Sequence, residues 1–267
     1  MRADLLNRPA AHEAKCDKSG GHPVADRDQT HLSEAIAWLV RAAEVMPSGG
    51  ISRGFSFGWN PYFPKRGWQP AHPRATGEAV VTLFDCAAFL GRDDLRKLAI
   101  ASANWLIKIQ MLGGAIRGGA LDEPPSSEVL NTAIAILSWN RAYRETGTER
   151  FAQAMRRGCE FLIHAQDPQN KSKDKSIPDR LHADAPACAQ AGLALIQAGI
   201  ALEEYRYCAA GEKSVALRLR LQQPNGWFRD NCPDNTRHPL LQSIAGCVEG
   251  ILQVGIVLEE EKYFEAA

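Results

Sequence analysis

The sequence lacks the features that mark several functional classes. Its 31 lysine and arginine residues are balanced by 31 aspartate and glutamate residues, so the formal net charge is zero. This balance argues against a nucleic-acid-binding protein with a broad basic surface and against a polybasic membrane anchor. No uncharged apolar run reaches the roughly 18 residues that indicate a membrane span. The first 21 residues also lack the apolar core of a secretory signal.

Cysteine usage and short motifs exclude further classes. The chain has seven cysteines, and no two of them form a Cys-x-x-Cys pair. Because their number is odd and most lie in apolar, helix-like segments, they indicate reduced, mostly buried thiols in a cytoplasmic protein rather than a disulfide framework. The sequence contains no Gly-x-Ser-x-Gly, His-Glu-x-x-His or Walker motif. We therefore expect a cytoplasmic protein that uses no cofactor.

A repeat organises most of the chain. Residues 1–29 are polar and aperiodic, which predicts a disordered N-terminal leader. From residue 30 to 267, helix-like segments alternate with polar loops, and almost nothing has the pattern of a strand. A repeat of about 56 residues runs through this domain. Three registers keep its spacing: Leu95, Phe151, Tyr207 and Tyr263; Trp105, Phe161 and Leu217; and Gln110, Gln166 and Gln222.

Each repeat contains two helices that differ in polarity. We expect first members near residues 75–90, 127–145, 184–203 and 239–258, and second members near 31–46, 93–111, 149–166 and 206–222. The first members carry almost no interior charge, which is typical of a helix buried on both sides, whereas the second members are amphipathic. This pattern predicts an all-α fold in which outer helices wrap inner helices, an α/α toroid. An open solenoid of helix pairs is the alternative, and the scarcity of charge in the inner class favours the toroid.

The length predicts that the ring is incomplete. Six such units would need more than the 267 residues present. From His31 the chain offers one outer helix, three pairs, one inner helix and a remainder in which Tyr263 begins the next outer helix. We therefore expect about four to five helical hairpins. The chain is expected to be either a truncated gene product or a protein in which a second copy of the chain or a partner protein covers the exposed inner helix at the open end.

Long loops follow the outer helices, at 47–74, 112–126, 167–183 and 223–238. In a toroid these loops emerge at one end, and loops on a rigid scaffold carry function. They combine aromatic rings with carboxylates, amides, arginine and histidine, which suits sugars, because pyranose C–H faces pack on aromatic rings. The candidate catalytic residues are Asp122, Glu123, Asp230, His238 and His72. The candidate substrate-binding residues are Trp59, Tyr62, Trp68, Arg74, Arg117, His182, Trp227, Arg229 and Asn231.

These candidates fit more than one chemistry. Glycoside hydrolysis needs a pair of carboxylates, whereas a lyase or epimerase needs a histidine or tyrosine base with an arginine that neutralises a uronate. Simpler roles are open too, since loop aromatics can cap the helical core and carboxylates such as Asp94 and Asp184 can cap helix N-termini. Asp230, Cys232 and His238 are zinc-binding residue types, but their spacing matches no standard closed site, so we expect no metal.

Several motifs carry a family resemblance. An inner helix opens with Pro73, Thr76 and Gly77, a turn follows with Gly91 and Leu95, and an outer helix ends with Trp105, Leu106 and Gln110. At 222–246 a polar loop precedes a Pro-Leu-x-x-x-Ile-Ala segment. With these motifs, residues 70–267 resemble bacterial α/α-toroid proteins associated with exopolysaccharide biosynthesis, in the superfamily of six-hairpin glycosidases, polysaccharide lyases and terpenoid cyclases. The resemblance implies binding or processing of a polysaccharide or oligosaccharide by a hydrolase, lyase or epimerase.

Two other functions stay open beside this one. The family usually has an acidic residue where Arg74 stands and a histidine where Gln242 stands, which favours a non-catalytic helical scaffold or a degenerate enzyme. The loops also resemble the repeats of terpene cyclases and protein prenyltransferases. Asp230, Asn231 and Cys232 match the first part of the prenyltransferase zinc set, so an isoprenoid-handling toroid is the first alternative and the scaffold is the second.

Overall fold

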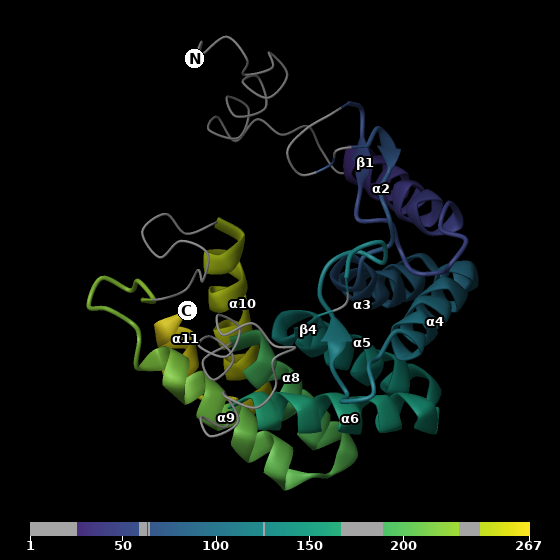
Figure 1. Ribbon diagram of the computed structural model, residues 1–267. Helices are drawn as coiled ribbons and strands as arrows, with labels where there is room; N and C mark the ends of the chain where they lie inside the picture. Colours follow the sequence, from purple (N-terminus) through teal and green to yellow (C-terminus); the bar gives the residue numbers. More distant parts are fainter. Residues whose placement is uncertain (1–25, 59–62, 64, 125, 167–188, 230–240) are drawn as a thin grey trace. The chain divides into compact units, whose positions relative to one another are not determined.

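The computed structural model describes residues 26–58, 63, 65–124, 126–166, 189–229 and 241–267 (Figure 1). Contacts divide the chain into two units, residues 1–41 and residues 42–267. The described part of the first unit is the helix α2 (Asp26–Glu44), whose last three residues belong to the second unit. Residues 26–29, expected in the leader, are therefore helical. They add a turn whose described side chains are exposed. The rest of the expected leader, 1–25, lies outside the described residues.

The second unit is built of helices joined by turns and loops. They are α3 (Pro73–Leu90), α4 (Asp93–Lys108), α5 (Val129–Thr146), α6 (Glu149–Gln166), α8 (Ala189–Leu202), α9 (Tyr205–Leu219), α10 (Leu241–Leu258) and α11 (Glu261–Ala266). The predicted all-α fold is confirmed. Two short antiparallel strand pairs occur in its loops, β1 (Phe55–Ser56) with β2 (Gly67–Trp68) and β3 (Ile116–Arg117) with β4 (Ser127–Glu128). Among the described helices, none has the length and apolar character needed to cross a membrane.

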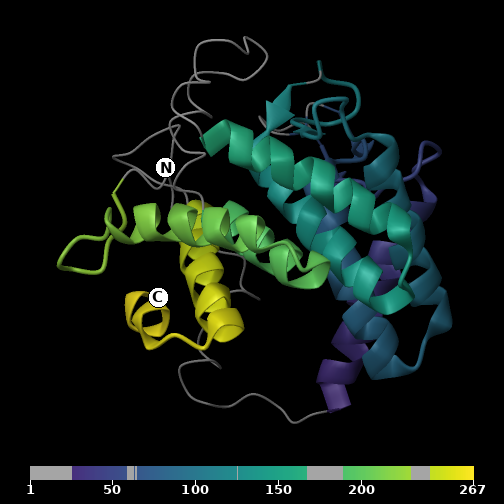
Figure 2. The same ribbon diagram turned by 90° about the horizontal axis from the view of Figure 1, so that it is seen from below.

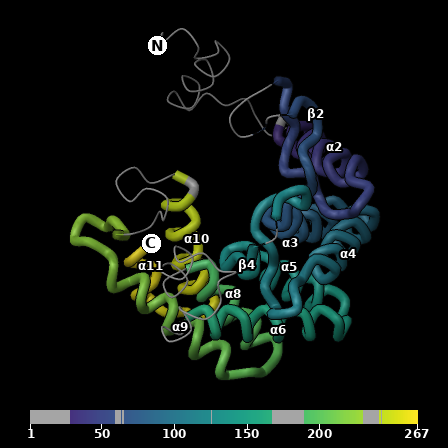
Figure 3. Tube along the Cα trace, in the orientation of Figure 1, coloured from purple at the N-terminus to yellow at the C-terminus, as the bar shows by residue number. Residues whose placement is uncertain are grey.

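The helices pack in the order that a repeat of helical hairpins requires. α3 packs on α4, α5 on α6, α8 on α9 and α10 on α11, so each predicted pair is formed. The first members also contact one another in succession, α3 with α5, α5 with α8 and α8 with α10 (Figures 2 and 3). The predicted pairing of consecutive helices is confirmed, while closure of the pairs into a toroid stays a prediction.

Burial separates the two helix classes as their polarity predicts. In α8 every residue from Ala191 to Ile196 is buried, whereas α6 buries one face, which includes Phe151 and Met155. α10 departs from the expectation of burial on both sides. Among the described first helices of the pairs, α10 packs mainly on α8, and its Leu252 and Ile256 side chains are 38% and 53% exposed. The second copy or partner expected to cover such a helix stays a prediction.

The sequence repeat is visible in the backbone. The residue after each first helix adopts the left-handed conformation, with φ of 65° at Gly91, 62° at Gly147 and 57° at both Glu203 and Glu259. The large side chain four residues further on, at Leu95, Phe151, Tyr207 and Tyr263, is at most 2% exposed in every repeat. Glycine accepts a left-handed φ freely, whereas a Cβ strains it. Each pair therefore turns in the same way, with strain in the last two repeats.

Glu203→Gly is expected to stabilise the protein by about 0.5–1 kcal/mol, because it removes this strain at an exposed position. The measurement is the free energy of unfolding from urea denaturation. The matched control is Gly147→Ala at the equivalent turn, which should destabilise by about 1 kcal/mol. Equal stability of Glu203→Gly and the parent protein would contradict the assignment of strain to this turn.

Two of the three glutamines in the third sequence register, Gln110 and Gln222, make the same pair of hydrogen bonds. The side-chain amide of Gln110 donates to the carbonyl of Gly114 at 2.9 Å and to that of Ala154 on α6 at 3.0 Å. Two repeats later, the acceptors of the Gln222 amide are the carbonyls of Gly226 at 3.3 Å and Ala266 at 2.8 Å. The amides of Gln110 and Gln222 thus join the end of one outer helix to the next outer helix, whereas the buried Nε2 of Gln166 has no hydrogen-bond acceptor within the described residues.

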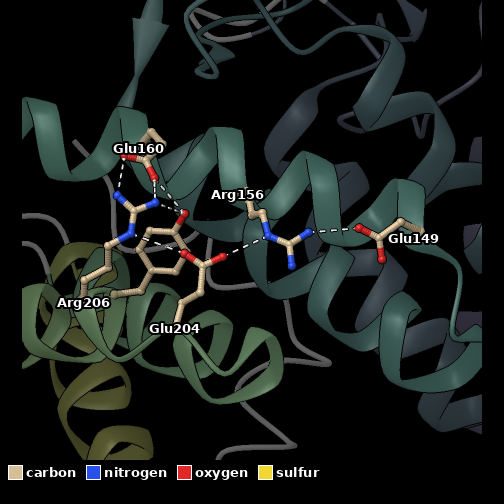
Figure 4. Close-up of polar contacts among 6 residues, drawn as sticks. Glu149, Arg156, Glu160, Glu204 and Arg206 are labelled. Carbon is tan, nitrogen blue, oxygen red and sulfur yellow. Dashed lines mark hydrogen bonds and ion pairs between the residues drawn. The ribbon is translucent and has the colours of Figure 1, made fainter.

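A polar network ties α6 to the start of α9 (Figure 4). Arg156 of α6 donates to Glu204, the residue before α9, at 2.9 Å, and the Tyr207 hydroxyl donates to Glu160 at 2.8 Å. Burial, and then the hydrogen bond to Glu160, raise the pKa of Tyr207, so the phenol stays protonated. Exposed ion pairs add little stability, so the buried ring of Tyr207 is the main anchor of this contact.

Candidate functional site

His72 forms the N-cap of α3. Its backbone is extended, with φ −124° and ψ 132°, and its Nδ1 accepts a hydrogen bond from the backbone N–H of Arg74 at 3.2 Å. Because Nδ1 is the acceptor, the neutral imidazole carries its proton on Nε2. The Thr76 hydroxyl donates to the carbonyl of His72 at 2.9 Å and accepts from the N–H of Ile51 at 2.9 Å. The preceding loop is thereby tied to the first turn of the helix.

Glu128 takes the same position on α5, one repeat later. Its backbone is also extended, and its Oε2 accepts from the N–H of Asn131 at 3.2 Å. Thr132, the equivalent of Thr76, donates to the carbonyl of Glu128 at 2.6 Å and accepts from the N–H of Ile116 at 2.8 Å. Since α3 and α5 pack together, the repeat gives neighbouring helices one titratable cap each.

A β-hairpin leads into His72. The β1–β2 pair continues through a hydrogen bond from the N–H of Arg53 to the carbonyl of Pro70, at 3.2 Å. The N–H of His72 donates to the carbonyl of Ile51 at 3.1 Å, just beyond the base of the hairpin. This ladder holds Arg53 beside the start of α3.

The loop 112–126 meets the base of this hairpin. The N–H of Leu121 donates to the carbonyl of Ala71 at 3.4 Å, and Nη1 of Arg53 lies 3.4 Å from Oε1 of Glu123. Arg117 anchors the loop, because its Nη2 donates to two carbonyls within it, one of them that of Glu123. Two of the long loops that were expected at one end of the fold therefore lie together.

The pKa values of the two capping side chains, His72 and Glu128, are shifted in opposite directions. Burial lowers the pKa of His72, and the charge of Arg53 lowers it further, against a smaller opposite effect of Glu123. Burial raises the pKa of Glu128, and this effect outweighs those of a backbone hydrogen bond and of Arg74. The site thus combines a neutral imidazole with a carboxyl group that keeps its proton to higher pH than usual. Such opposed shifts are typical of acid–base sites.

Three arginines surround the caps, and two of them face carboxylates. Arg74 pairs with Glu78, one turn further along α3, at 2.8 Å, and Arg53 pairs with Glu123. The guanidinium of Arg117 donates to backbone carbonyls instead. The Nε atoms of Arg53 and Arg117 are buried, and within the described part of the chain neither has a hydrogen-bond acceptor. Arg117 is therefore the one arginine of the three that has no carboxylate partner in these contacts.

Aromatic rings extend the site along the hairpin. The ring centroid of Phe55 lies 5.3 Å from that of Phe57 and 5.3 Å from that of Trp68, both with edge-to-face geometry. Phe57 is 86% exposed and Phe55 is 38% exposed. The Arg53 guanidinium lies 5.2 Å from the centroid of the Phe63 ring. The hairpin that carries the exposed aromatic rings thus also carries Arg53, which pairs with Glu123.

Comparison with protein-family models, with curated proteins and with solved structures finds no match for this chain. The resemblance to exopolysaccharide-associated toroids therefore stays a prediction. The motif residues Pro73, Thr76 and Gly77 open α3, and Gly91 ends it, where the resemblance implies helix boundaries.

The structure brings together part of the predicted site. The candidates joined by the contacts above are His72, Arg74, Arg117 and Glu123. Trp68 lies in the aromatic hairpin, and Asp122 is exposed beside Glu123 in the same loop. The sequence did not point to Glu128, because it falls in the helix expected over 127–145, whereas functional residues were expected in the long loops. Its place one full repeat after His72 was the signal that could have found it.

The remaining described candidates lie in the loop after α9. The N–H of Arg229 donates to the carbonyl of Leu221 at 3.0 Å, and Trp227 is 37% exposed in the same loop. The candidates Trp59, Tyr62, His182, Asp230, Asn231 and His238 lie outside the described residues, as do Asp184, Cys232 and the side chain of Gln242. In the ranges that the structure describes, no three metal-ligating side chains form a group.

Asp94 does not have the capping role that was considered for it. α4 begins at Asp93 and its N-cap is Arg92, which makes no side-chain capping hydrogen bond. Asp94 instead accepts from Nε of Arg92 at 3.1 Å. Carboxylate capping is found at Glu128, where the carboxylate faces the first turn of α5.

Glu128→Gln is expected to stabilise the protein at pH 7–8 by about 0.5–2 kcal/mol and to change little at pH 4. The folded-state pKa of Glu128 is raised, so its contribution is full below its unfolded pKa and is lost as the pH rises through the folded pKa. Glutamine keeps a neutral acceptor for the cap at every pH. Urea denaturation across this range measures the difference, and Glu265→Gln on the exposed surface of α11 is the control. A gain that is the same at pH 4 and pH 8 would contradict the raised pKa.

Proposed function

We propose that the site at the N-terminal ends of α3 and α5 binds an oligosaccharide and processes it by acid–base chemistry. The supporting observation is the meeting of two loops: the hairpin presents the rings of Phe55 and Trp68, and the loop 112–126 places Glu123 against Arg53. Sugar C–H faces pack on aromatic rings, and sugar hydroxyls need charged or polar partners. This part of the molecule offers both.

The hydrogen bonds suggest a role for each group. Nδ1 of His72 is occupied by the helix cap, so its Nε2–H donates to a ligand oxygen, as a neutral imidazole can at a helix N-terminus. Glu123, which is half exposed, is the proton acceptor, and Glu128, whose pKa is raised, is the proton donor. Glycoside hydrolysis, elimination and epimerisation each need one acceptor and one donor, so a hydrolase, lyase or epimerase is the enzyme class proposed.

Trp68→Ala is expected to weaken binding of an oligosaccharide by about three- to tenfold, because a stacked aromatic ring contributes roughly 0.5–1.5 kcal/mol beyond its area. Thermal-shift screening of neutral and acidic oligosaccharides identifies a ligand, and calorimetry then compares the variants. Phe89→Ala is the control, because Phe89 is an exposed aromatic residue at the opposite end of α3.

The same screen separates the alternatives. If no sugar in the screen stabilises the protein, the proposal is wrong and a helical scaffold is the function that remains. Stabilisation by an isoprenoid diphosphate together with a stoichiometric zinc content would replace it with an isoprenoid-handling function. Equal affinity of Trp68→Ala and the parent protein would remove the aromatic hairpin from the site.

A further inference from the structure

The ion pair between Arg53 and Glu123 is loose. Its shortest N–O distance is 3.4 Å, whereas charge-assisted hydrogen bonds are typically about 2.7–2.9 Å. The side chains are 24% and 47% exposed, so water and solutes reach both. An exposed pair of this geometry contributes little to stability. The contact can therefore open at low free-energy cost.

Each partner is held in place independently of the pair. Arg53 is fixed by the backbone ladder of the hairpin, and its guanidinium lies over the ring of Phe63. The carbonyl of Glu123 accepts from Arg117, which holds the backbone of the loop. The glycine at 119 leaves room for the carboxylate, because a Cβ there would lie 2.2 Å from Oε2 of Glu123. Only the Glu123 side chain has to move for the pair to separate.

We propose that the ligand of this site carries a carboxylate that replaces Glu123 as the partner of Arg53. This inference rests on the proposed function and names the substrate class, an acidic oligosaccharide. The guanidinium of Arg117, which donates to carbonyls of the Glu123 loop, adds positive charge to this part of the site, and the Nε2–H of His72 is a further donor there. The exchange frees the Glu123 carboxylate beside His72. An acidic sugar thus releases the proton acceptor as it binds, whereas a neutral sugar leaves the pair closed.

Glu123→Gln gives the sharpest test, because it removes the competing carboxylate and leaves Arg53 unpaired. The probes are short oligomers of galacturonate, glucuronate and mannuronate, each compared with its methyl ester, in which the sugar is unchanged and the carboxylate is blocked. We expect Glu123→Gln to bind an acidic oligomer about five- to tenfold more tightly and Arg53→Gln to bind it about tenfold more weakly, with the esters unaffected in both. Asp93→Asn makes the same change of charge at the exposed Lys97 pair on α4 and should leave every affinity unchanged.

The possible outcomes separate this inference from the function on which it rests. If neither acids nor neutral sugars bind, the proposed function and the inference fail together. If esters bind as tightly as acids, or Glu123→Gln leaves the affinity for acids unchanged, the inference is overturned while a sugar-binding site stands. Competition by inorganic phosphate at the same concentration as the acidic oligomer would show a phosphate site and overturn the carboxylate assignment.

Discussion

Replacing Trp139 with alanine is expected to destabilise the protein by about 3–5 kcal/mol, which is a large part of the stability of an ordinary domain. Trp139 lies on α5 and is completely buried, and its indole N–H donates to the carbonyl of Ala103 on α4 at 3.1 Å. α5 packs against α3, α4, α6 and α8. Alanine would therefore leave a cavity among several helices and a carbonyl without its donor.

Urea denaturation followed by circular dichroism measures this loss. Trp139→Phe retains most of the ring and removes the donor, so about 1–3 kcal/mol is expected. Phe89→Ala, on the exposed face of α3, should change the free energy of unfolding by less than about 0.5 kcal/mol. A loss below about 1 kcal/mol for Trp139→Ala would contradict the central packing of α5.

The helical pairs could be predicted because they depend on local patterns that repeat. The left-handed turn and the buried side chain four residues after it recur in each pair, from Gly91 and Leu95 to Glu259 and Tyr263. The exposure of α10 could not be predicted in this way. Its composition is that of an inner helix, but burial depends on which neighbours are present, and α8 covers one side.

The site was predictable in its composition and not in its contacts. Loop residues such as His72 and Glu123 stood out because aromatic, basic and acidic side chains gather between apolar helices. The pairing of Arg53 with Glu123 spans 70 residues and follows from tertiary packing, which one sequence does not record. The sequence offered His72 as the histidine base of a lyase. In the structure the N–H of Arg74 donates to Nδ1 of His72, so the neutral imidazole is a hydrogen-bond donor at Nε2, which the sequence could not show.

Thr132→Val is expected to destabilise the protein by about 1–3 kcal/mol and to weaken acidic-ligand binding. Valine keeps the shape of threonine but removes the hydroxyl, which leaves the buried N–H of Ile116 without its acceptor and the carbonyl of Glu128 without its donor. Ile116 begins β3, and the next residue is Arg117. Loss of this tie therefore loosens the strand that positions an arginine of the site.

The control is Thr82→Val, since the hydroxyl of Thr82 is exposed and donates only within its own helix, to the carbonyl of Glu78 at 3.2 Å. Its expected effect on stability is below about 0.5 kcal/mol. Equal effects of the two valine substitutions would contradict a positioning role for Thr132.

Thr76→Val makes the equivalent change at the first cap and loosens Ile51, next to the hairpin that carries Arg53. Because Arg53 is the proposed carboxylate partner, Thr76→Val should reduce the preference for acid over ester, whereas Thr82→Val should leave that preference intact.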